Sequence, residues 1–317
     1  MDVLAYLWDN WLFAAFLAPF LLALVNIIDV YFVSSVYEDE WDGILINSIF
    51  QGLPWLLPLL GIVEFQLPDA VTVLVAFLAG SGLALSYFFY FKTLFVSNDA
   101  VIVQALSNLS VPLVPFLAWL IIDEKLSLVH YVGIFIAFIG AMLFSLHSEL
   151  RERSYWRVCK VMSGAIIFFS LSLVLQAEVY QTLNGEFFTG FLLFSAGASI
   201  TGLALSFFDK KSAGSRALHI FRMSRAYVIV FALAETLNLL GVVVTQRAIE
   251  LSPSVSFVAV IGSLTPVFVL FTSLFLIPVF FLLNKERSRL MYRDQLVAFK
   301  TKIAACCIIA IGIYLIS

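Results

Sequence analysis

Cysteine and histidine are scarce in this sequence, with three of each among 317 residues. Cys159 lies in a basic segment, and Cys306 and Cys307 are neighbours in the last apolar run. This arrangement offers neither a disulfide framework nor the ligand spacing of a metal site. The histidines also lack metal spacing, and none has an evident nucleophile beside it. We therefore expect no metal ion, no cofactor and no enzyme activity.

Charge is the second shortage. Charged residues make up 12% of the chain and hydrophobic residues 62%, and the mean hydropathy is +1.03. A soluble chain of this length could not bury so much apolar surface in its core. The net charge of −3 gives no reason to expect a nucleic-acid partner. Lipid is therefore the expected surrounding of most side chains.

Apolar runs long enough to cross a hydrocarbon layer of about 30 Å occur repeatedly along the chain. Ten can be counted, near 11–37, 44–62, 70–92, 100–122, 126–147, 161–183, 187–208, 226–248, 254–283 and 296–316. Each should be helical, because lipid offers backbone amides no hydrogen-bond partners. The sequence thus predicts an all-α integral membrane protein with ten transmembrane helices.

The two halves of the chain, 1–150 and 151–317, resemble each other. Asp29-Val30-Tyr31 in the first apolar run of one half matches Glu178-Val179-Tyr180 in the first run of the other. The stretch from Lys92 to Ser97 likewise aligns with the stretch from Arg247 to Ser252. An odd number of crossings in each half leaves the halves oppositely oriented. We therefore expect two inverted five-helix repeats.

Positive charge sets the expected orientation. Every Lys and Arg except Lys125 and Arg247 falls at an odd-numbered connection between the expected helices. Basic residues favour the cytoplasmic side, so the odd loops should be cytoplasmic and both termini outside, in a plasma (inner) membrane. Lys92 and Arg247, at matching span ends, are interpreted as side chains that snorkel to the interface, with a ligand-binding role as the alternative.

Polar side chains inside the apolar runs are the candidates for function, because a charge at bilayer depth costs about 2.5–3.5 kcal/mol on insertion scales. Three acids qualify, and each has an amide three residues away on the same helical face, while another run adds two amides. These candidates are Asp29 with Asn26, Glu178 with Gln181, Glu235 with Asn238, and the pair Gln104 and Asn108. We expect a polar cavity between the halves in which the acids bind a cation or proton.

The alternative for each of these residues is a structural role. Interhelical hydrogen bonds in membranes commonly serve packing, Asp29 could be solvated near the interface, and Glu235 could pair with a buried neighbour. Trp55 and Tyr87 are weaker candidates for the cavity wall, with lipid or core contact as the alternative. Pro112 and Pro266, which match in the repeat, are expected hinge points or else static kinks.

One part of the chain resembles a known family. Ala84-Leu85-Ser86-Tyr87 and the run LSNLSVPLVPFLAWLIIDEKLSLVHYVGIFIAFIGAMLFS at 106–145 are similar to the fourth and fifth helices of the EamA type of the drug/metabolite transporter superfamily. The similar features are Pro112, Trp119, the turn Glu124-Lys125, and the small residues Gly133 and Gly140. The resemblance implies ten helices in two EamA-like halves around a central cavity.

These observations predict a secondary active transporter that moves a small polar or amphipathic metabolite by alternating access between its halves. Protonation of Asp29, Glu178 or Glu235 would couple that movement to a proton gradient. A flippase for a lipid or lipid-linked sugar is the alternative, and an intramembrane enzyme is more distant. ATP use is not expected, since no GxxxxGK[ST] motif occurs. The expected partners are the substrate, membrane lipids and protons, with the protein a monomer or homodimer.

Overall fold

A computed structural model describes residues 8–35, 37, 39–97, 103, 106–145, 152–208, 225–280 and 299–316. Within these ranges the chain forms helices and turns and contains no strand, which confirms the all-α prediction. Six of the described helices are long and apolar enough to cross a membrane. The protein is therefore a multi-pass α-helical membrane protein.

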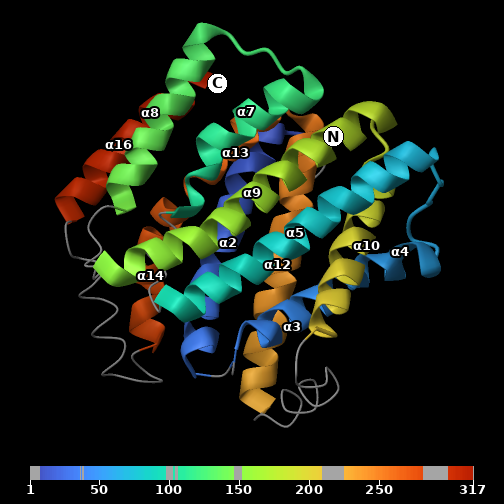
Figure 1. Ribbon diagram of the computed structural model, residues 1–317, viewed down its shortest axis with the longest axis horizontal. Coiled ribbons are helices and arrows are strands. Elements are labelled where there is room, and N and C mark those ends of the chain that lie inside the picture. Colours follow the sequence, from blue (N-terminus) through green and yellow to red (C-terminus); the bar gives the residue numbers. More distant parts are fainter. Residues whose placement is uncertain are drawn as a thin grey trace.

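The described residues of the first half form five long helices and a broken segment. In order these are α2 (Trp11–Ser35), α3 (Glu40–Gly52), the 3₁₀ turn η1 (Leu53–Trp55), α4 (Leu56–Leu59), α5 (Ala70–Ser97), α7 (Ser110–Ile122) and α8 (Leu128–Ser145). The second half contains α9 (Glu152–Leu183), α10 (Phe187–Ser206), α12 (Arg225–Leu251), α13 (Val255–Gly262), α14 (Thr265–Phe280) and α16 (Phe299–Ile316). Figure 1 shows these helices packed obliquely in one bundle.

The second expected span, 44–62, is displaced and broken. Helix α3 begins earlier, at Glu40, because the side chain of Asp39 accepts a hydrogen bond from the backbone N–H of Trp41 at 3.1 Å and caps the helix. It ends at Gly52, and Pro54 lies in the 3₁₀ turn that follows. α3 buries several polar side chains and packs against α10.

The fourth and ninth expected spans are interrupted near their centres. Pro112 and Pro266 lie in the first turns of α7 and α14, and proline has no N–H for the carbonyl four residues earlier. The Asn108 carbonyl accepts instead from the backbone N of Val111 at 3.0 Å. The Gly262 carbonyl accepts from Thr265 Oγ1 at 2.8 Å. Both interruptions therefore have a local cause in the sequence.

Glycines let two helix pairs approach closely. A Cβ at Gly80 of α5 or at Gly197 of α10 would overlap backbone of the other helix. A Cβ at Gly312 of α16 would lie 2.5 Å from the backbone N of Ala137 on α8, and one at Gly133 would lie 2.9 Å from the Gly312 carbonyl. Small residues at these crossings are what membrane helices use for close packing.

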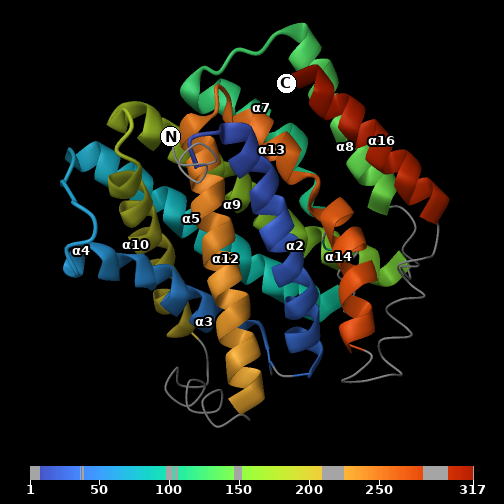
Figure 2. The same ribbon diagram turned by 180° about the vertical axis from the view of Figure 1, so that it is seen from behind.

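The helices pack in a regular pattern. Helix α5 packs against α9, and α2 against α12; α7 packs against α9, and α2 against α14. Further pairs are α5 with α10, α3 with α10, α7 with α13, and α8 with α16, and the last pair lies side by side at one edge of the bundle in both views (Figures 1 and 2). This arrangement leaves α8 and α16 outside a central group of helices.

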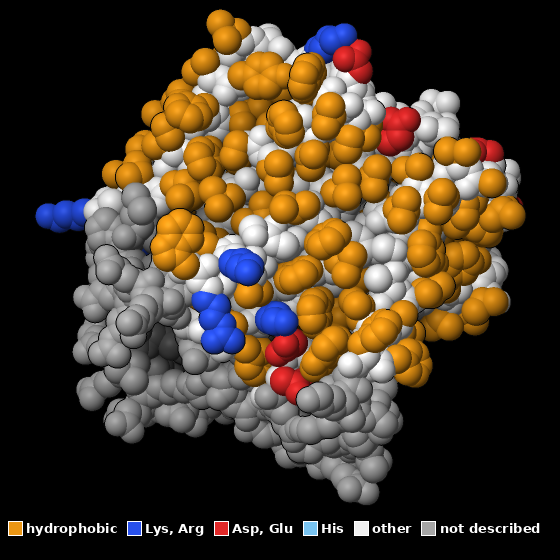
Figure 3. Space-filling view, in the orientation of Figure 1, with side chains coloured by type: hydrophobic (Ala, Val, Ile, Leu, Met, Phe, Trp, Pro, Cys, Tyr) orange, Lys and Arg blue, Asp and Glu red, His pale blue; other side chains and the backbone are white. Residues whose placement is uncertain are grey.

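The outer surface of the bundle suits lipid. Large apolar side chains are exposed on several helices, among them Leu128, which is 80% exposed, and Phe135 on α8. Figure 3 shows hydrophobic side chains over most of one face, with Lys and Arg gathered mainly in one group. A surface this apolar would be costly in water, so the exposed faces of these helices are expected to contact acyl chains.

Candidate functional site

A cavity of about 190 Å³ lies inside the central group of helices. Its walls come from α2, α3, α5, α7, α9, α12 and α13, together with the two interruptions. Six of the residues singled out in the sequence line it, namely Asn26, Asp29, Tyr87, Asn108, Glu235 and Asn238. The structure thus brings together residues from four separate segments of the chain.

Glu235 of α12 lies in a hydrogen-bonded chain that crosses the cavity wall. Its side chain is 4% exposed, and its Oε2 accepts from Asn47 Nδ2 of α3 at 3.4 Å and from Asn238 Nδ2 at 3.5 Å. Asn238 Oδ1 in turn accepts from the hydroxyl of Tyr87 on α5 at 3.2 Å. The expected pairing of Asn238 with Glu235 on one helical face is therefore present.

Asp29 of α2 is buried but has no such support. It is 7% exposed, and within the described part of the chain it has neither a hydrogen-bond nor an ion-pair partner. Glu235 is close enough to act on Asp29 electrostatically. No hydrogen bond joins Asn26 to Asp29 in the described structure, and Asn26 Oδ1 accepts from the hydroxyl of Tyr90 at 2.8 Å.

The charge in this cavity is one-sided. Both acids line it, and none of its described lining residues is Lys, Arg or His. Two carboxylates buried without a cation are unfavourable, because neither the solvent nor a counter-ion compensates the desolvated charge. This arrangement is suited to binding protons or a cationic ligand.

The two helix interruptions also face the cavity. Ser107, Asn108 and Ser110 line it at the fourth span, and Ser263 and Thr265 line it at the ninth. Pro112 and Pro266 lie beside these residues in the first turns of α7 and α14 but do not themselves line the cavity. Their role as hinges stays a prediction.

Several candidates from the sequence lie elsewhere. Glu178 is half-buried and Gln181 is exposed, and both lie near the end of α9, outside the cavity lining. The indole Nε1 of Trp55 donates to the Leu192 carbonyl of α10 at 2.9 Å, so this side chain joins two helices and does not line the cavity. Gln104 lies outside the described residues.

Asn47 and Tyr90 line the cavity but were not singled out as candidates from the sequence. Asn47 is 3% exposed and donates to Glu235, and the signal that could have found it is an amide inside an expected span, with a second amide, Gln51, four residues later. Tyr90 lies three residues after Tyr87 on α5, one helical turn along the same face. Repeat matching could not single out either residue.

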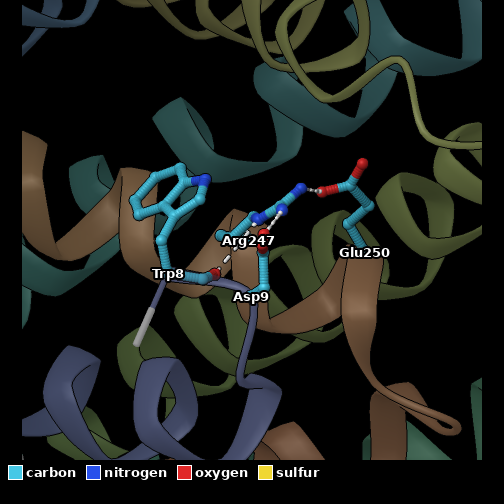
Figure 4. Close-up of polar contacts among 4 residues, drawn as sticks. All are labelled: Trp8, Asp9, Arg247 and Glu250. Atoms are coloured by element: carbon cyan, nitrogen blue, oxygen red, sulfur yellow. Dashed lines mark hydrogen bonds and ion pairs between the residues drawn. The ribbon is translucent and has the colours of Figure 1, made fainter. Parts of the chain in front are cut away.

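A second polar cluster lies where α12 ends (Figure 4). Arg247 Nη2 contacts Asp9 Oδ1 at 2.6 Å, Nη1 pairs with Glu250, and Nε donates to the Trp8 carbonyl at 3.4 Å. The guanidinium also lies over the rings of Trp8 and Phe187. The Arg247 side chain is only 13% exposed, and these contacts rather than solvent surround its guanidinium. Long-range partners hold it in place.

Glu124 makes a neighbouring contact between the halves of the chain. Its carboxylate accepts from the hydroxyls of Ser254 and Ser256 and from the backbone N of Val255 at 3.2 Å. These groups lie at the N-terminus of α13, where an acid satisfies free N–H groups and interacts favourably with the helix dipole. Glu124 therefore caps a helix of the second half from a loop of the first.

No protein-family model matches the chain, and no curated protein matches it either. Among solved structures, 26 chains do match. One of them is a crystal structure whose sequence is 15% identical to this chain. The two structures superpose with a TM-score of 0.60, over 96% of this chain and 97% of that chain. At this identity the likeness shows the fold alone.

Proposed function

We propose that the protein is a secondary active transporter that moves a small polar or amphipathic metabolite by alternating access. The observation that carries this proposal is the buried pair Asp29 and Glu235 in a central cavity whose described lining has no basic side chain. Ionisable residues at bilayer depth persist mainly where they bind an ion or substrate. The cavity lies among helices from both halves of the chain.

The packing pattern supports an inverted repeat of ten spans. Counting the spans in chain order, α5 and α9 are the third and sixth, and moving both by five gives α12 with α2, which also pack together. The same exchange turns the pair α7 and α9 into α14 and α2. Such exchange symmetry is the expected signature of two inverted five-helix repeats, as in the EamA-like architecture that the sequence resembles.

Alternating access requires contacts that form at one end and break when that end opens. Two sets of contacts join the halves at the end where α12 stops: Arg247 with Asp9, and Glu124 with the start of α13. In this proposal they close that end of the bundle. By the positive-inside rule it is the outer end, in a plasma (inner) membrane, with both termini outside.

Proton coupling completes the proposal. A proton on Asp29 or Glu235 neutralises one of two mutually repelling acids, so proton and substrate compete for the same charge. Release of the proton on one side of the membrane would then be linked to binding of the substrate. The proposed functional partners are the substrate and protons, in a monomer or homodimer surrounded by lipid.

A thermal-shift screen of the full chain in detergent tests the proposal, because a ligand that binds the folded state raises the unfolding temperature. We expect a hit among amino acids, amines, nucleosides or sugar phosphates that Glu235→Gln abolishes and Glu178→Gln, outside the cavity, retains. No soluble hit combined with transfer of headgroup-labelled lipids across vesicles would overturn the proposal in favour of a flippase.

A further inference from the structure

Most hydrogen-bond donors identified in the cavity wall are already used within the protein. Tyr87 donates to Asn238, Tyr90 donates to Asn26, and Asn47 donates to Glu235. The acceptor capacity of Asp29 is by contrast unused within the described part of the chain. A ligand that fits this wall must therefore bring donors of its own.

Prolines leave two backbone carbonyls of lining residues without their usual helical donor. Pro19 of α2 cannot donate to the carbonyl of Ala15, and Pro115 of α7 cannot donate to the carbonyl of Val111. Ala15 and Val111 both line the cavity. Carbonyls without their helical donor are the groups that membrane transporters use to hold cations.

Aromatic rings complete the environment of a cation. Tyr87, Tyr90, Phe91 and Phe169 line the cavity, and the faces of such rings attract positive charge. The remaining walls are largely aliphatic, which suits an apolar body attached to the charged group. An inorganic ion alone would leave this apolar surface without a partner.

The amide of Asn108 adds a buried donor to the cavity wall. Asn108 lines the cavity at 4% exposure, and its Nδ2 has no hydrogen-bond partner in the described structure. A buried donor without a partner is unfavourable until a ligand supplies an acceptor. A hydroxyl, ether or carbonyl oxygen on the ligand would satisfy it without adding negative charge near the two acids.

We propose that the substrate is an organic cation, a protonated amine on a small apolar or aromatic body, with the ammonium bound between Asp29 and Glu235. This inference rests on the proposed function, which it makes specific. The ammonium N–H groups donate to the carboxylates, and the rings of Tyr87 and Tyr90 flank the charge. An anionic solute of the same size is excluded by repulsion from both acids.

Three probes of similar size test the proposal: phenethylamine, 2-phenylethanol and 3-phenylpropionate, each titrated against the purified full chain in detergent at neutral pH. We expect the amine to raise the unfolding temperature at a concentration about tenfold or more below that required by the alcohol, and the anion to have no effect. Equal or tighter binding of the anion would overturn the proposal.

Variants then locate the site. Asp29→Asn and Glu235→Gln are expected to weaken amine binding about tenfold or more, while Glu178→Gln leaves it unchanged. Tyr87→Phe keeps the ring and Tyr87→Leu removes it, so only the second should weaken binding if the ring contacts the cation. Where an acid variant does not yield folded protein by gel filtration, this tyrosine pair decides the location. If Asp29→Asn, Glu235→Gln and Tyr87→Leu all left amine binding unchanged, the proposed location of the site would be contradicted.

Separate assays of binding and uptake distinguish a failure of the proposed ligand class from a failure of the proposed transport function. Amine binding without uptake into proteoliposomes would uphold the ligand class and overturn the transporter. Uptake of an anionic or neutral solute, with no amine binding, would uphold the transporter and overturn the ligand class.

Discussion

Two glutamates of α12 have opposite surroundings. Glu250, at the end of the helix, pairs with Arg247, which also holds Asp9. Glu235, four turns earlier, has only two amides, and the neighbouring acid Asp29 has no partner in the described part of the chain. The first arrangement neutralises buried charge inside the protein and the second leaves it for a proton or ligand. The ion pairs thus stabilise one end of the bundle, whereas the proposed binding site in the cavity keeps its acids without a cation.

The cations that match in the repeat differ in the same way. Arg247 is 13% exposed and lies 2.6 Å from Asp9, whereas Lys92 is 42% exposed and lies 3.9 Å from Glu40. Lys92 also lies over the ring of Phe88. In an inverted repeat these residues belong to opposite ends of the bundle. The closer contacts at the Arg247 end are what a state closed at that end requires.

The largest expected effect is at the cavity acids. Glu235→Gln should reduce uptake of the transported solute by about tenfold or more, because the amide cannot hold a cation or exchange a proton. It should leave thermal stability unchanged or higher, since it removes one of two repelling buried charges. Uptake and the unfolding temperature are measured on the same preparation. A large loss of stability with normal uptake would instead give Glu235 the structural role of Glu250.

Arg247→Met should have the largest effect on stability. It leaves Glu250, a side chain only 5% exposed, without its cation, and removing one partner of a buried pair costs about 3–5 kcal/mol. Thermal unfolding in detergent measures the loss. The double variant Arg247→Met/Glu250→Gln should recover much of it, because the unpaired acid is then gone. No recovery would mean that the ion pair is not the source.

Glu124→Gln should cost less, about 1 kcal/mol, because the amide oxygen still accepts a hydrogen bond while the charge at the N-terminus of α13 is lost. The same thermal assay measures this loss. Glu124→Ala, which also loses the hydrogen bonds, should be less stable than Glu124→Gln. Equal stability of all three proteins would show that this cap does not hold the two halves together.

Lys92→Met should change stability by less than about 1 kcal/mol, as for an exposed ion pair. It is the matched control for Arg247→Met, since both replace a cation at a corresponding position by an apolar side chain. A loss as large as that of Arg247→Met would remove the difference between the two ends.

The smallest effect concerns Asp69, which precedes α5. The Thr72 hydroxyl donates to Asp69 Oδ2 at 2.5 Å, and this hydrogen bond, with those from the backbone, lowers the pKa of the carboxyl. Its contribution to stability is present above the pKa of the unfolded state and is lost as pH falls through the lower pKa of the folded state. Asp69→Asn should therefore flatten the acid side of the stability profile slightly. Thr72→Ser, which keeps the hydroxyl, should not.

The sequence predicted the cavity residues where burial itself makes a polar group unusual. Asp29, Glu235, Asn238 and Asn108 were found because ionisable and amide groups inside apolar runs need a partner. Glu178 has the same local pattern as Asp29 but lies near a helix end. If the repeats are inverted, matched residues move toward opposite faces of the membrane, so repeat matching alone could not bring both into one cavity.

The remaining contacts depend on tertiary structure. Asp9 and Arg247 are separated by 238 residues, and Glu124 and Val255 by 131, so no local pattern connects them. Trp55 lies inside the second expected span in the sequence, yet its indole donates to a helix of the other half. Helix identity could be predicted from composition and periodicity, whereas these pairings follow only from how the helices pack.

Uptake into proteoliposomes under an imposed pH gradient tests the central claim most directly, namely that Asp29 and Glu235 form the binding site of a transporter. The predicted result is saturable uptake that rises with the gradient, is lost in Asp29→Asn and Glu235→Gln, and persists in Glu178→Gln. Uptake that ignores the gradient and survives substitution of all three acids would contradict the account.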